Sequence, residues 1–121
     1  MKKMIIKECY EAMGENYNEV LARLQLEKLI VKYALKFLDD PNYGMLVEAW
    51  KEKDYEAAYR ASHTLKGICS NLGFSKLGSM SANLADALKE NKIEQAEAIF
   101  PEIEGIYSNM ISVLTEFQKT L

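Results

Sequence analysis

Residues 54–73 read DYEAAYRASHTLKGICSNLG, which is the pattern of one amphipathic helix with a start signal and a stop signal. Asp54 is a residue type that caps helix N-termini, and Gly73 stands where a helix commonly ends. At 100° per residue, the small and apolar side chains between them fall on one stripe. The members of this stripe are Ala58, Ala61, Leu65, Cys69 and Leu72. We therefore predict a helix over 54–72 that buries this stripe against neighbouring helices.

Helical spacing of apolar residues continues toward the N-terminus. It predicts a short helix over 5–13, one long helix from about Asn18 to Leu38, and a shorter helix over 42–53. Gly14 ends the first of these. Pro41 ends the second, because the residue before a proline is pushed out of helical geometry.

Two more helices are predicted toward the C-terminus. Ser75 can cap one over 75–91, and the last runs over 93–117, where Pro101 either kinks it or marks its restart. Six glycines and two prolines in 121 residues are too few for the many turns of a sandwich or barrel. Short connections favour antiparallel neighbours. We predict an all-α single domain over 1–121, an antiparallel up-and-down four-helix bundle with an additional N-terminal helix in 1–16.

Composition excludes several classes of function. The net charge of −3 disfavours a nucleic-acid partner, and no apolar stretch approaches the roughly 20 residues that span a membrane. The two cysteines, Cys9 and Cys69, have no metal-ligand spacing, so no metal site is predicted. Charges interrupt the first apolar residues, so we expect no signal peptide and a cytoplasmic protein.

The single histidine, His63, does not belong to the buried stripe. The same rotation places it roughly 160–170° from the middle of the stripe, so it points to solvent. Gly67 follows one turn later, although a glycine inside a helix costs about 1 kcal/mol relative to alanine. Without a Cβ there, a bulky group has room beside the imidazole, and Lys66 carries a cation to the same place. A neutral imidazole is a nucleophile, so this arrangement suits a covalently attached phosphate.

These residues alone leave two interpretations of His63 open: a residue that accepts a phosphate, and an ordinary solvated side chain. A lone surface histidine is usually a solvated side chain, and the bundle would then be a scaffold whose histidine is never phosphorylated. A metal or haem bundle is disfavoured, because it would need several inward-facing ligands.

The segment HTLKG at 63–67, followed by NLG at 71–73, resembles the signature of histidine-containing phosphotransfer (HPt) domains of two-component phosphorelays. The resemblance covers about residues 18–118. It implies that His63 is the phosphoacceptor, that Lys66 stabilises the phosphoryl group and that Gly67 provides clearance. It also implies that 71–73 shape the end of the helix.

The resemblance implies a phosphorelay intermediate that takes a phosphoryl group from a receiver-domain aspartyl phosphate and passes it to another receiver. Such a domain is not an enzyme with its own nucleotide or metal site, and Mg²⁺ is expected on the partner receiver. The expected partners are response-regulator receiver domains, including those of hybrid sensor kinases. We expect a monomer. The absence of linker composition favours a free-standing protein, and a domain of a hybrid kinase stays open as the alternative.

The docking face is expected to surround His63 and to include Tyr59, Ile68, Ser70 and Phe74. Two departures from the family pattern bear on partner choice: Leu84-Ala85-Asp86 stands where a Leu-Glu pair is common, and Ile68 and Cys69 replace small residues.

Overall fold

The computed structural model describes residues 4–121, which form seven α-helices and one 3-10 helix. In chain order these are α1 (Ile6–Ala12), α2 (Tyr17–Leu24), α3 (Glu27–Lys36), η1 (Phe37–Asp39), α4 (Asn42–Lys51), α5 (Tyr55–Leu72), α6 (Ser75–Lys89) and α7 (Ile93–Lys119). The predicted all-α fold is therefore confirmed.

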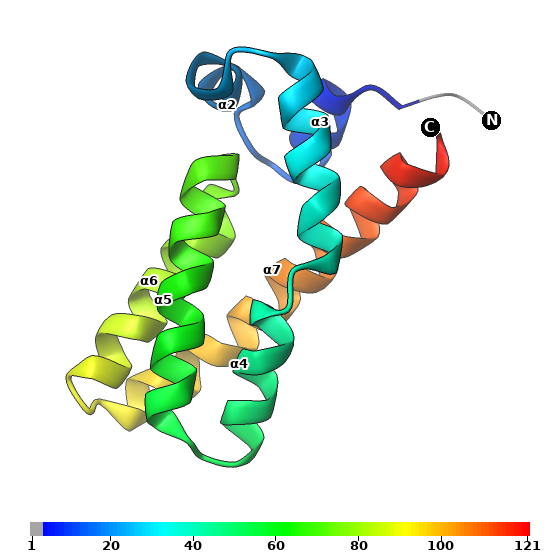
Figure 1. Cartoon of the computed structure of the whole chain (residues 1–121). Coiled ribbons are helices and arrows are strands. Elements are labelled where there is room, and N and C mark those ends of the chain that lie inside the picture. The colour runs from blue at the N-terminus through cyan, green and yellow to red at the C-terminus, as the bar shows by residue number, and fades with distance from the viewer. Residues whose placement is uncertain (1–3) are drawn as a thin grey trace.

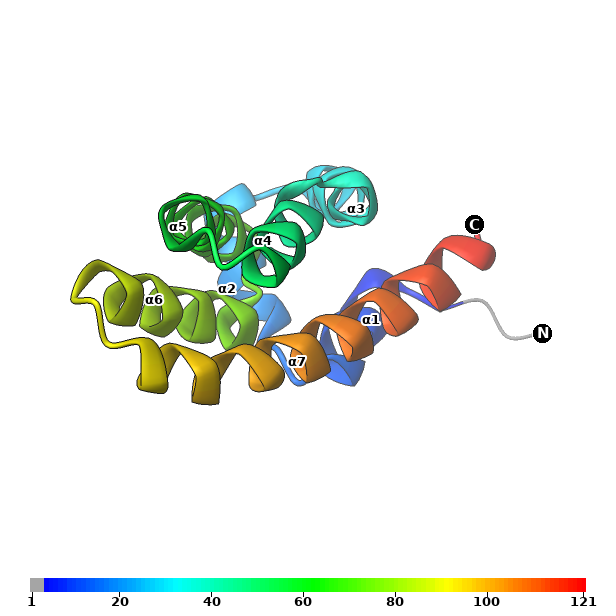
Figure 2. The same ribbon diagram turned by 90° about the horizontal axis from the view of Figure 1, so that it is seen from below.

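Helices α4, α5, α6 and the first half of α7 form the bundle (Figures 1 and 2). Helix α5 packs against both α4 and α6, and α6 packs against α7. Aromatic rings join α4 to α7. The ring centroids of Trp50 and Phe100 lie 4.7 Å apart, and the ring of Tyr43 stacks on that of Tyr107 with centroids 3.7 Å apart. The antiparallel order follows from the short connections between successive helices.

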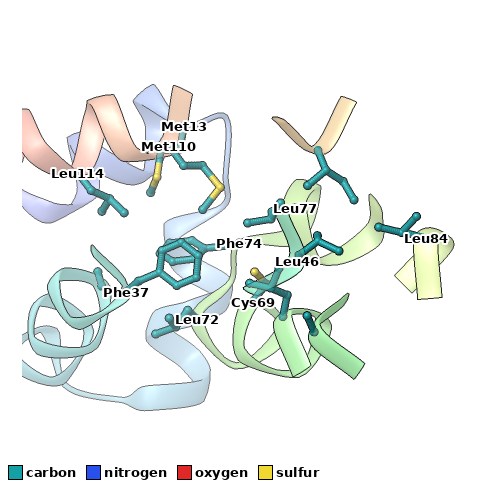
Figure 3. Close-up of a cluster of buried hydrophobic side chains, with 14 of the residues drawn as sticks. Met13, Phe37, Leu46, Cys69, Leu72, Phe74, Leu77, Leu84, Met110 and Leu114 are labelled. Atoms are coloured by element: carbon teal, nitrogen blue, oxygen red, sulfur yellow. The ribbon is translucent and has the colours of Figure 1, made fainter. Parts of the chain in front are cut away.

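The second half of α7 extends beyond the bundle and packs against α1, while α1 also contacts α2 and α3 (Figure 2). One continuous core joins the two parts. Figure 3 shows its side chains, which come from α1, η1, α4, α5, α6, α7 and the connection between α5 and α6. The labelled members are Met13, Phe37, Leu46, Cys69, Leu72, Phe74, Leu77, Leu84, Met110 and Leu114.

The long helix predicted over 18–38 is wrong, because the chain breaks at Gln25. This residue adopts a left-handed conformation with φ 67°, and its N–H caps α2 by donating to the carbonyl of Leu21. Helix α2 packs against α5, whereas α3 also contacts α7 (Figure 1). No glycine or proline marks the break; α2 and α3 both contact α1 and α5, and α3 adds contacts with α7.

The two ends of α5 agree with the predicted capping residues, whereas the caps at the starts of α2 and α6 differ from the predicted ones. Asp54 caps α5 by accepting the N–H of Ala57 at 3.1 Å, and Gly73 ends it at φ 72°. Asn16, not Asn18, caps α2. Phe74 occupies the N-cap position of α6. Helix α7 runs through Pro101 without a restart (Figure 2).

Candidate phosphotransfer site

His63 lies near the middle of α5, on the face opposite the core. Its side chain is exposed, whereas every member of the predicted stripe is buried, from Ala58 to Leu72. The 100° rotation of an α-helix is enough to produce this division. The imidazole is thus presented to solvent by a helix that is held by α4 on one flank and α6 on the other.

The hydroxyl groups next to His63 are already used by the helix backbone. Ser62 is buried, and its Oγ donates to the carbonyls of Ala58 at 2.9 Å and Tyr59 at 3.0 Å. Thr64 Oγ1 donates to the carbonyl of Arg60 at 3.0 Å. Neither hydroxyl therefore competes for the imidazole, whose ring partner is Tyr59, with centroids 5.8 Å apart and planes 22° apart.

The two cations nearest in sequence to His63 differ in their partners. Arg60 Nη1 lies 2.9 Å from the Glu56 carboxylate, one turn earlier on α5. Lys66 is exposed and forms no ion pair within residues 4–121. Its ammonium is therefore available to an incoming anion, whereas the Arg60 guanidinium already has a carboxylate partner on the surface of α5.

Two glycines shape the surroundings of this turn. A Cβ added at Gly67 would meet nothing within 4 Å, so the surface beside His63 is open. A Cβ added at Gly78 of α6 would lie 3.2 Å from the Cβ of Cys69. Gly78 therefore lets α6 approach α5 closely at Cys69, in the second turn after His63. Gly78 was not among the predicted site residues, although a glycine inside a predicted helix is a signal of close packing or function.

The predicted docking residues do not all reach the surface. Tyr59 and Ile68 are half-buried, and Ser70 is exposed. The predicted place of Phe74 on the docking face is wrong, because its side chain is fully buried. Its ring centroid lies 5.5 Å from that of Tyr10 and 5.2 Å from that of Phe37.

A groove of about 460 Å³ runs between α2, α3 and the C-terminal part of α5. Ile68 and Asn71 line it from α5, and Arg23 lines it from α2. The Arg23 guanidinium donates to the backbone carbonyl of Ser70. Sequence reasoning missed Arg23, because nothing in the local pattern places α2 beside α5.

Residues 4–121 contain no group of three or more His, Cys, Asp or Glu side chains placed to hold a metal ion. None of their helices is long and apolar enough to cross a membrane.

Comparison with known proteins gives one family and one relative. The family model of the Hpt domain matches residues 18–113. A phosphorelay intermediate protein, rdeA, of Dictyostelium discoideum is 27% identical over 74 residues, which cover 61% of this chain and 29% of that protein. No solved structure matches significantly. Since the family model covers most of the chain, including the histidine-bearing helix α5, the chain belongs to the Hpt domain family.

Proposed function

We propose that this chain is a phosphorelay intermediate in which His63 accepts a phosphoryl group from the aspartyl phosphate of a receiver domain. A second receiver domain then takes the group, or the first takes it back. The observation that carries this proposal is the exposed imidazole of His63, set within the HTLKG segment beside the open surface at Gly67. The match of the Hpt family model to residues 18–113 supports it.

The transfer exchanges one bond to phosphorus for another. The lone pair of a neutral imidazole nitrogen forms the N–P bond as the O–P bond of the aspartyl phosphate breaks, and the bonding electrons leave with the carboxylate. Little other covalent chemistry is required, so catalysis consists of positioning and charge stabilisation. Lys66 supplies a cation for the phosphoryl oxygens, and the open surface at Gly67 accommodates them.

The remaining parts belong to the partner in this proposal. The receiver domain holds Mg²⁺ beside its aspartyl phosphate, and the phosphoryl group passes between the two proteins within their complex. The partners are receiver domains of response regulators, including those of hybrid sensor kinases. We place the chain in the cytoplasm as a monomer, which docks through the exposed surface around His63.

The test is phosphoryl transfer from a ³²P-phosphorylated receiver domain in the presence of Mg²⁺. Wild-type protein should acquire label that is acid-labile and stable to alkali, and His63→Gln should acquire none. Phosphoramidate, a small phosphodonor, should label wild type but not His63→Gln, which checks the reactivity of the imidazole without docking.

The competing function is a scaffold whose histidine is not phosphorylated. It predicts no label on a folded wild-type protein from any receiver in a broad panel. It also predicts that His63→Ala leaves partner binding and signalling intact. Either result would overturn the proposal.

A further inference from the structure

We infer that Tyr59 is a positioning residue that sets the orientation of the His63 imidazole for phosphoryl transfer. This inference rests on the proposed function, since it concerns how the same histidine reaches the phosphorus atom. Tyr59 precedes His63 by one helical turn on α5, and the two rings stack with centroids 5.8 Å apart and planes 22° apart. This separation lies within the range of offset aromatic stacking.

The stack determines which side of the imidazole is covered. Side chains of an α-helix lean toward its N-terminus, so the His63 ring leans over Tyr59 and away from Gly67. One face of the imidazole is therefore covered by the tyrosine ring. The other side opens toward the surface above Gly67, where a Cβ would meet nothing within 4 Å. Lys66 follows His63 by three residues on α5 and is exposed, so its ammonium can reach a phosphoryl group that approaches from the Gly67 side.

Tyr59 is suited to hold another ring because it is itself held. Its side chain is half-buried and packs against the hydrophobic core. By contrast, no hydrogen bond or ion pair holds the imidazole of His63 within residues 4–121. Stacking on Tyr59 is thus the aromatic contact that can limit rotation of the imidazole in residues 4–121.

Orientation affects the rate because transfer requires the nitrogen lone pair to point along the line of the breaking O–P bond. As the N–P bond forms, the aspartyl carboxylate leaves with the bonding electrons on the opposite side of phosphorus. A ring that rotates freely spends most of its time in unproductive directions, and small misplacements of reacting groups can cost up to about a hundredfold in rate.

The experiment compares Tyr59→Leu and Tyr59→Met, which remove the ring, with Tyr59→Phe, which keeps it and removes only the hydroxyl. Two ring-removing variants are used so that one folded variant suffices, with folding checked by circular dichroism. The first readout is the NMR shift of the His63 ring protons, which the tyrosine ring current displaces. The second is the maximal single-turnover rate of transfer from a receiver that labels wild type, together with the receiver concentration that gives half-maximal rate.

We expect removal of the ring to abolish the ring-current shift and to lower the maximal transfer rate about tenfold, as for a modest loss of orientation. The half-maximal receiver concentration should change less than about twofold. Tyr59→Phe should retain both the shift and the rate. Labelling by phosphoramidate should be unchanged in all three variants, because a small donor is free in solution and can align itself with the imidazole in whatever orientation the ring adopts.

Other results would overturn this inference while leaving the proposed function intact. An unchanged maximal rate in folded Tyr59→Leu or Tyr59→Met would show that the stack has no role in transfer. An increase confined to the half-maximal receiver concentration would make Tyr59 a docking contact. A slow Tyr59→Phe would assign the effect to the hydroxyl. Failure of wild type itself to accept label from any receiver would instead contradict the proposed function.

Discussion

The hydroxyl of Tyr10 donates a buried hydrogen bond of 2.6 Å to the backbone carbonyl of Leu72, 62 residues away in sequence. Leu72 is the last residue of α5, where the carbonyls have no partner within the helix. Helix α1 precedes the residues that match the family model, yet it completes the end of the histidine-bearing helix. The N-terminal extension is therefore part of the structural support of the site.

Replacing Tyr10 by phenylalanine should lower the free energy of unfolding by about 1–2 kcal/mol, because the Leu72 carbonyl then stays buried without a partner. Urea denaturation followed by circular dichroism measures this change. Tyr33→Phe is the matched control, since Tyr33 is 38% exposed and its hydroxyl can turn to water. Equal stability of the two variants would contradict the role assigned to the Tyr10 hydroxyl.

Glu15 should be a second support from the N-terminal extension. Its carboxylate is 8% exposed and accepts hydrogen bonds from Ser75 Oγ at 2.5 Å and from the N–H of Lys76 at 3.0 Å, at the start of α6. Glu15→Ala should cost about 2–3 kcal/mol, because hydrogen bonds to a charged group are stronger than neutral ones. A double-mutant cycle with Ser75→Ala should give a coupling energy above about 0.5 kcal/mol. Strict additivity would show that the contact contributes nothing to stability.

Gly67 should lower the stability of α5 while leaving the space that phosphoryl transfer needs. Gly67→Ala adds a Cβ in open space and should raise the free energy of unfolding by about 0.5–1 kcal/mol. Gly67→Gln should block phosphoryl transfer, because its side chain occupies the space beside His63. Gly105→Ala and Gly105→Gln are matched controls, since Gly105 also lies in open space but on α7. Transfer by Gly67→Gln as fast as by Gly105→Gln would refute the clearance role.

Lys66 and Arg60 should differ in their effect on transfer. Lys66→Ala should reduce the maximal transfer rate about tenfold, equivalent to about 1.4 kcal/mol, because a cation that faces the phosphoryl oxygens is lost. Arg60→Ala should change it less than about twofold, since its guanidinium is paired with Glu56 at 2.9 Å. Single-turnover kinetics with a phosphorylated receiver measures both. A larger loss in Arg60→Ala would reverse this assignment.

Alkaline pH should destabilise the fold through its buried thiols. Burial raises the pKa of Cys9 from 9.0 to about 11 and that of Cys69 to about 12. Above pH 9 the unfolded chain loses thiol protons that the folded chain keeps. The free energy of unfolding should then fall with rising pH, by up to about 1.4 kcal/mol per pH unit for each thiol.

Urea denaturation at pH 8, 9 and 10 measures this dependence, and Cys9→Ala should show a smaller slope than wild type. The thiols titrate first in the unfolded chain, and the phenols of Tyr10, Tyr17, Tyr43 and Tyr107, whose pKa values burial also raises, add to the fall in stability toward pH 10. Stability that is constant from pH 8 to 10 would contradict the burial of the thiols.

Features set within one helix were predictable from local sequence. The two ends of α5, the outward direction of His63 and the buried stripe opposite it all follow from capping chemistry and a constant rotation per residue. The open surface at Gly67 needed only the absence of a side chain at that position. Membership of an α-helical bundle followed from apolar periodicity over most of the chain.

Features set between helices were not predictable in this way. The break at Gln25 has no glycine or proline to signal it, and the two helices that it separates share α1 and α5 as neighbours, whereas only α3 reaches α7. Phe74 comes directly after Gly73, where α5 ends, and was therefore predicted to lie on the surface. Instead, the rings of Tyr10 from α1 and Phe37 from η1 pack against it.

The local chain thus determined which residue presents an exposed imidazole on α5, because periodicity and capping depend on neighbours within a few positions. The supports of that residue depended on the tertiary structure. Tyr10, Glu15 and Arg23 each reach α5 or the start of α6 from segments 47 to 62 residues away. Their hydrogen bonds form only where hydrophobic burial has brought those segments together, so no residue spacing in the sequence predicts them.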